Sequence, residues 1–115
     1  MVEREMQRQK YFLEPGLTLD SLSRKVGTNR SYLSQVIYGV AGCNFCTYIN
    51  RLRMEELMHC GDDAMESENA LYDRALHCGF NSKRNFNRVF LREMGMLPCD
   101  FVAMYKNSIN FVTDF

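Results

Sequence analysis

The sequence has no long apolar run, and nothing in it marks the chain for export. A helix that crosses a bilayer needs about 20 consecutive apolar residues, which this chain nowhere provides. The first ten residues, MVEREMQRQK, are charged and lack the apolar segment of a signal peptide. The sequence therefore predicts a cytoplasmic protein, with no membrane contact from this segment.

Net charge is the second absence, since 14 basic side chains balance 14 acidic ones. A protein without excess positive charge does not bind nucleic acid through bulk charge alone, so the distribution of charge matters more than its sum. Residues 17–53 carry five Lys or Arg and one acid, and residues 79–92 carry four and none. Between them, residues 54–73 are acidic and contain no Lys or Arg. The sequence predicts two basic lobes separated by an acidic middle.

Motifs for catalysis are also missing. The chain has no phosphate-binding loop, no Ser-His-Asp set and no carboxylate pair suited to acid–base chemistry. We therefore expect a binding protein rather than an enzyme. Apolar material, by contrast, is plentiful: 46% of the 115 residues, including eight Phe and eight Met, suffices for one domain, residues 1–115, with a modest core.

Five cysteines are an odd number, and their scatter through helical patterns indicates reduced thiols rather than a disulfide framework. Cys43 and Cys46, followed by His59, begin a zinc-finger spacing, but the second histidine is missing. The remaining thiols fit helix packing positions, namely Cys60, Cys78 and Cys99. We predict no metal and no cofactor, with a zinc- or thiol-responsive module as the alternative.

Caps and glycines divide the first half of the chain into helices. Residues 3–13 are expected to form a short helix that Pro15-Gly16 stops. Two more helices follow, begun by Thr18 and Asn29 and ended by Gly27 and Gly42. The longest periodic segment, Phe45 to Cys60, is expected to be a rigid spacer with Arg51 and Arg53 on its outer side.

The helices of residues 18–42 have the spacing of a helix-turn-helix unit. Ser23 is a small residue where the two helices cross, Gly27 stands four positions later in the turn, and apolar anchors follow on the second helix. The exposed face of that second helix carries Arg30, Ser31, Ser34, Gln35 and Tyr38. Short polar side chains beside a glutamine favour reading of a DNA groove, while an ordinary helical hairpin needs the same apolar positions.

The stretch from Cys78 to Pro98, CGFNSKRNFNRVFLREMGMLP, sets a turn before a helix with two contrasting faces. Asn81 or Ser82 begins this helix, and its inward stripe is Phe86, Val89 and Phe90. The outer face holds Lys83, Arg84, Asn87, Arg88 and Arg92, with no acidic neighbour. Arginine grips phosphates or the acceptor edge of guanine, and an asparagine amide fits adenine. This face predicts contact with nucleic acid.

The two units form an internal repeat. At an offset of 53 residues, Leu33, Val36 and Ile37 match Phe86, Val89 and Phe90, Gly42 matches Gly95, and Cys46 matches Cys99 in a first-turn packing position. Before the turns the offset is 52, which pairs Gly27 with Gly79. The sequence therefore predicts helix-turn-helix units at residues 18–42 and 70–95, joined by a linker helix at residues 45–60.

The phrases LTLDSLSRKVGTNRSYLSQVI, FCTYINRLRMEEL and CGFNSKRNFNRVFLREMGMLPCDF resemble the C-terminal DNA-binding domain of the AraC/XylS family of bacterial transcription regulators. The resemblance implies an all-α, seven-helix domain with two recognition helices in neighbouring major-groove turns of double-stranded DNA. The contact positions that it carries over are Arg30, Ser31, Ser34 and Gln35, and then Lys83, Arg84, Asn87 and Arg88. It also implies RNA polymerase as a partner and a sensory, receiver or dimerisation domain beyond this chain.

Some positions depart from the family pattern. Tyr38-Gly39 replaces a usual basic pair, and Gly39 in a helix interior is expected to let that helix end fray. Arg74 stands at an inward aliphatic position, so its stem is expected to be buried and its charge to snorkel or to meet Asp73 or Asp100. Leu97 replaces the usual Ser or Thr cap. A helical protein-interaction domain that has lost DNA binding is therefore the other alternative.

Overall fold

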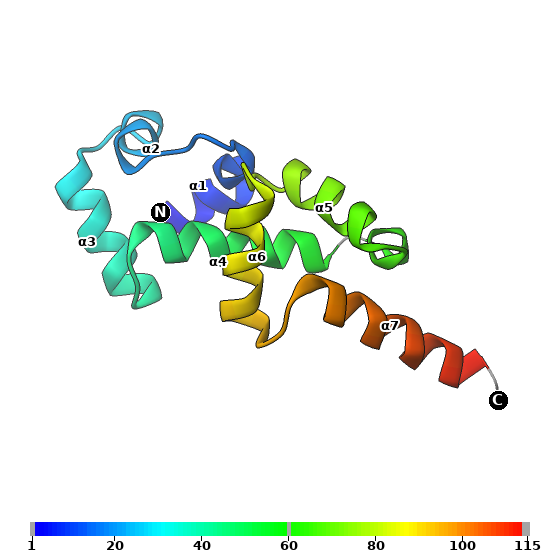
Figure 1. Cartoon of the computed structure of the whole chain (residues 1–115). Coiled ribbons are helices and arrows are strands. Elements are labelled where there is room, and N and C mark those ends of the chain that lie inside the picture. The colour runs from blue at the N-terminus through cyan, green and yellow to red at the C-terminus, as the bar shows by residue number, and fades with distance from the viewer. Residues whose placement is uncertain (1, 60, 114–115) are drawn as a thin grey trace.

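The computed structural model describes residues 2–59 and 61–113, and within these residues every regular element is a helix (Figure 1). The all-α fold class is confirmed. The elements in chain order are α1 Val2–Gln9, the short 3-10 helix η1 Tyr11–Leu13, α2 Leu19–Lys25, α3 Arg30–Ala41, α4 Phe45–Met58, the 3-10 helix η2 Asp62–Met65, α5 Glu68–His77, α6 Lys83–Met94 and α7 Pro98–Thr113. Cys60, the predicted end of the linker helix, lies outside the described residues.

The helices form an elongated molecule, 54 × 25 × 23 Å, with α4 running through its middle (Figure 1). Helices α2 and α3 lie at one end, α5 and α7 lie at the other, and α6 crosses α4 (Figure 1). Two clusters of buried side chains follow this division. One joins Leu22, Leu33 and Ile37 to the first half of α4, and the other joins its second half to α5, α6 and α7. The single long helix thus serves both cores.

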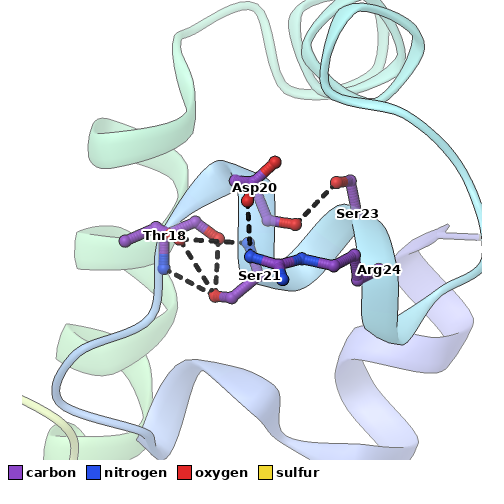
Figure 2. A network of polar contacts seen from close by, with 5 residues as sticks. All are labelled: Thr18, Asp20, Ser21, Ser23 and Arg24. Carbon is purple, nitrogen blue, oxygen red and sulfur yellow. Dashed lines mark hydrogen bonds and ion pairs between the residues drawn. The ribbon is translucent and has the colours of Figure 1, made fainter.

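Side-chain caps begin the helices where the sequence predicts. The Thr18 hydroxyl accepts the Ser21 N–H at 3.0 Å, and the Ser21 hydroxyl in turn lies 3.0 Å from the Thr18 N–H (Figure 2). Each cap thereby satisfies a backbone donor that the first helical turn leaves unpaired. Asn29 caps α3 in the predicted way, and Ser82, rather than Asn81, caps α6.

The repeat is visible in the backbone. Helices α3 and α6 each have twelve residues, and each ends at a glycine in the left-handed region, Gly42 with φ of 70° and Gly95 with φ of 76°. The turns before them hold Gly27 and Gly79, which also have positive φ. Because that conformation costs a residue with a Cβ roughly 1–2 kcal/mol, glycine is the residue that lets both units turn alike.

The N-terminal segment belongs to the core. The predicted continuous helix of residues 3–13 is wrong, because Lys10 adopts a left-handed conformation that separates α1 from η1. Met6 and Phe12 are nevertheless buried in the cluster of the first unit. The segment of residues 6–17, called the N-terminal strap below, therefore packs against that cluster.

Arg53 corrects the predicted outer face of α4. Arg51 is exposed as expected, but Arg53 is only 6% exposed. Its Nε donates to the Phe12 carbonyl at 2.7 Å and its Nη2 donates to the Glu14 carbonyl at 2.8 Å. Burial lowers the pKa of this guanidinium from its ordinary value. Arg53 thus ties the linker helix to the N-terminal strap.

Three further predictions of burial are wrong. Arg74 is exposed, because Leu71, Ala75 and Cys78 supply the buried stripe of α5. Cys46 and Cys99 are also exposed, so their matching first-turn positions lie on the outer side of α4 and α7. The burial predicted for Cys78 is confirmed. Cys46 and Cys99 are thus alike in exposure, whereas Arg74 is exposed and its counterpart in the first unit, Leu22, is buried.

Substitution of Gly39 tests the helical conformation of α3 at that residue. Helix α3 continues through Gly39 to Ala41, and a Cβ added at Gly39 would meet no atom within 4 Å. Alanine has the higher helix propensity, so Gly39→Ala is expected to raise the free energy of unfolding by about 1 kcal/mol, measured by chemical denaturation. The control is Gly42→Ala, which should destabilise because φ there is 70°. A loss of stability in both variants would contradict the helical conformation at Gly39.

Candidate nucleic-acid interface

Helix α6 separates an apolar inner face from a basic outer face. The Ser82 hydroxyl accepts the Asn85 N–H at 3.0 Å and so fixes where the helix begins. From that start, Phe86, Val89 and Phe90 are all buried, which confirms the predicted inward stripe. Ring contacts hold this stripe in place: Phe86 meets Phe90 edge to face at 5.5 Å between ring centroids. The basic side chains are therefore presented by a rigid helix.

The outer face of α6 is hollowed. Arg84, Asn87 and Arg88 line one open hollow of about 550 Å³, together with Ser82, Asn85, Leu91 and Leu97. None of these seven lining residues is acidic. Arg84 and Arg88 are exposed, and the Arg88 Nη2 donates to the Asn85 amide oxygen at 2.8 Å. That bond uses one of the five N–H donors of the guanidinium. It also restricts the orientation of the other four donors.

Asn87 has a partner that the sequence did not reveal. It is half-buried, and its Oδ1 accepts a hydrogen bond of 2.6 Å from the hydroxyl of Tyr72 on α5. A carboxylate oxygen of Glu68 lies 3.2 Å from the same hydroxyl. Burial is the main reason that the pKa of Tyr72 is raised above its ordinary value, so the phenol keeps its proton at neutral pH. In the internal repeat, the residue equivalent to Tyr72 is Asp20. The repeat therefore gave no indication of the contact between Tyr72 and Asn87.

Lys83 lies apart from the three residues of the hollow. Its Nζ stands over the ring of Tyr72, 4.5 Å from the centroid, in cation–π geometry. The lysine lines a second, smaller hollow of about 270 Å³ between α5 and α6, which Tyr72, Phe80 and Phe86 also border. Of the four predicted positions on α6, the structure thus brings three together and sets the fourth beside Tyr72.

The predicted positions on α3 share one exposed surface. Arg30, Ser31, Ser34 and Gln35 are all exposed, whereas Leu33 and Ile37 are buried. Tyr38 continues this surface one turn further on and is 67% exposed. Arg30 is the one basic residue of α3. The first face is consequently less basic than the second and carries an aromatic ring near its end.

Helix α2, which precedes the turn into α3, is restrained by polar contacts along its own length. Thr18 and Ser21 exchange hydrogen bonds at the start of α2, the Ser23 hydroxyl donates to the Asp20 carbonyl at 2.7 Å, and Arg24 pairs with the Asp20 carboxylate (Figure 2). Ser23 is buried, as expected for a small residue at a helix crossing. Helix α2 is thus fixed both at its cap and at its contact with α3.

Neither a metal site nor a membrane span occurs among the residues that the structure describes. No group of three or more His, Cys, Asp or Glu side chains in them is close enough together to hold a metal ion. No helix in the same residues is long and apolar enough to cross a membrane.

Comparison with known proteins assigns the class and then the family. A family model described as a helix-turn-helix domain matches residues 22–104, so the chain is a helix-turn-helix protein. It belongs to the AraC family of such domains, the family of DNA-binding transcription regulators that its motifs resemble.

Named relatives support the same assignment. Regulatory protein SoxS of Salmonella typhimurium is 27% identical over 89 residues, which cover 77% of this chain and 80% of SoxS. The C-terminal domain of AraT, a response regulator from Geobacillus stearothermophilus, has a TM-score of 0.72 at 26% identity, covering 90% of this chain and 84% of that one. The C-terminal domain of the two-component response regulator YesN from Fusobacterium nucleatum has a TM-score of 0.69 at 23% identity, covering 87% and 96% respectively, and supports the fold.

Proposed function

We propose that α3 and α6 read two boxes of one operator, each entering the major groove on the same side of a DNA duplex. The observation that carries this proposal is the hollow on α6, where Arg84, Arg88 and Asn87 converge and none of the lining residues is acidic. Arginine forks hold phosphate oxygens or the O6 and N7 of guanine, and amides bond to base edges. The same surface therefore supplies both positioning and base recognition.

Helix α3 contributes a weaker reading surface in this proposal. Its exposed set has one cation, Arg30, where α6 has Lys83, Arg84 and Arg88. Ser31, Ser34 and Gln35 can bond to bases or phosphates but add no charge. The second unit is accordingly expected to supply most of the affinity, while the first extends the site that is recognised.

Selection of bound sites from a random duplex pool tests the proposal. Two reading helices in neighbouring groove turns require two boxes about 10 base pairs apart from centre to centre. Binding should weaken steeply as salt is raised, because cationic contacts release counterions from the phosphates. Recovery of random sequence, or of one short box, would contradict two working readers. Failure to bind duplex DNA at low salt would instead favour a protein-interaction domain.

The two recognition helices, α3 and α6, are expected to contribute unequally to DNA affinity, which gives a second test of the proposal. Arg88→Ala is expected to weaken specific binding by about 1 to 3 kcal/mol and to relax one base position, because a bidentate contact is lost. Gln35→Ala is expected to cost less, since a neutral amide makes weaker bonds. Titration of both variants with the selected duplex measures the difference. Equal losses would contradict the asymmetry.

We further propose that the domain works attached to a sensory, receiver or dimerisation domain. The support is that AraT and YesN are response regulators whose C-terminal domains resemble this chain. RNA polymerase as a partner and a cytoplasmic location stay predictions. Co-purification of RNA polymerase with the DNA-bound regulator would test the first of these.

A further inference from the structure

The Tyr72 hydroxyl lies where it can control how Asn87 meets a base. Tyr72 comes from α5, and its ring packs edge to face on Phe86, with 5.5 Å between centroids. That packing directs the hydroxyl past the buried stripe of α6 to the amide of Asn87. Asn87 in turn lines the same hollow as Arg84 and Arg88. One side of its amide thus meets the protein, and the other side borders the proposed DNA surface.

The phenol has one proton and two acceptors within reach. Its oxygen is 2.6 Å from Oδ1 of Asn87 and 3.2 Å from the carboxylate of Glu68. The shorter distance assigns the proton to Asn87. This bond uses one of the two lone pairs of the amide oxygen and turns that oxygen toward Tyr72. The amide NH2 group, which only donates, is therefore left for the hollow.

That assignment alters which base suits Asn87. Adenine is read by asparagine through a pair of bonds, in which Oδ1 accepts from N6 and Nδ2 donates to N7. With Oδ1 held by Tyr72, an outward NH2 group would face the adenine N6 amino group, and two donors repel each other. Guanine, with O6 and N7, and thymine, with O4, instead present acceptors.

We propose that Tyr72 is a positioning residue that turns the Asn87 amide, so that the second reader selects guanine or thymine over adenine at one base position. The proposal rests on the proposed function, since it concerns the same DNA-binding surface. It assigns a specificity role to a residue that lies on α5, outside the recognition helix.

Tyr72→Phe is the matched variant, because it removes the hydroxyl and keeps the ring that contacts Phe86 and Lys83. The selected duplex is first scanned with Asn87→Ala to find the position where discrimination is lost. Four duplexes that differ at that position are then titrated with the wild type and with Tyr72→Phe. The ratio of adenine binding to guanine or thymine binding should rise by roughly three- to tenfold in the variant, the scale of one hydrogen bond.

Two further variants separate positioning from packing. In the double variant Tyr72→Phe with Asn87→Ala, the base ratio should equal that of Asn87→Ala alone, since the hydroxyl acts through Asn87. Glu68→Ala removes the competing acceptor and should leave discrimination against adenine intact. If the hydroxyl donated to Glu68 instead, the Asn87 amide would present its oxygen to the hollow in the wild type. A shift away from adenine in Glu68→Ala would therefore overturn the assignment of the proton. Cooperative melting of each variant verifies that it folds.

The outcomes distinguish this inference from the proposed function. If the wild type selects a site but Tyr72→Phe weakens all four duplexes equally, the positioning role is overturned and DNA reading stands. The same holds if the base ratio does not change. If the wild type shows no salt-dependent binding to duplex DNA, the proposed function and the positioning role fail together.

Discussion

Replacing Gly79 with alanine is expected to destabilise the protein by roughly 3 kcal/mol or more, because backbone strain and a steric clash coincide there. Gly79 has a φ of 106°, which side-chain-bearing residues rarely adopt. An added Cβ would also lie 2.6 Å from Nε of Arg53 and closer still to the Phe12 carbonyl oxygen. Neither neighbour can withdraw freely, since the two are hydrogen-bonded to each other.

Gly27 provides the matched control for this prediction. It occupies the equivalent turn of the first unit, with φ of 77°, but a Cβ there would meet no atom within 4 Å. Gly27→Ala should therefore cost only the conformational strain, about 1 to 2 kcal/mol. Urea denaturation of both variants measures the difference. Equal losses would show that the strap at Phe12 does not approach the second turn in solution.

The sequence predicted local features of the fold well. Thr18, Asn29 and the glycines at the helix ends act through bonds and dihedral angles within a few residues, so their types alone indicate where helices begin and end. The stripe Phe86, Val89 and Phe90 was equally readable, because its spacing matches one helical face. Because the pattern of caps, glycines and apolar positions occurs twice in the chain, each copy supported the helices predicted for the other.

Contacts between distant segments escaped prediction. Arg51 and Arg53 look alike in the sequence, and only the fold distinguishes them, since the acceptors of Arg53 are backbone carbonyls about forty residues away. Backbone acceptors leave no mark in residue types. Tyr72 was missed for a related reason: its bond to Asn87 joins α5 to α6, and no equivalent exists in the repeat. The exposure of seven of the eight candidate residues was predictable, but the hydrogen bond that restrains the eighth, Asn87, was not.

Arg53→Met is expected to lower the free energy of unfolding by about 2 to 4 kcal/mol. Methionine fills much of the volume of the arginine stem but donates no hydrogen bond, so the Phe12 and Glu14 carbonyls lose their shared donor. A buried acceptor left without a partner costs about 1 to 3 kcal/mol, and bonds from a charged donor stand at the upper end of hydrogen-bond strengths. The N-terminal strap should loosen as a result, which hydrogen exchange at the amides of residues 10–17 would detect.

Arg51→Met is the control, because it makes the same chemical change two residues away on the same helix. Arg51 is exposed, and its Nε lies 3.5 Å from a Glu93 carboxylate oxygen. An exposed pair of this kind contributes about 0 to 1 kcal/mol, so the control should lose little stability and leave exchange in the strap unchanged. If the two variants unfolded at the same denaturant concentration, Arg53 would not hold the strap. If the expected difference is found, the bonds of Arg53 hold the N-terminal strap to the linker helix.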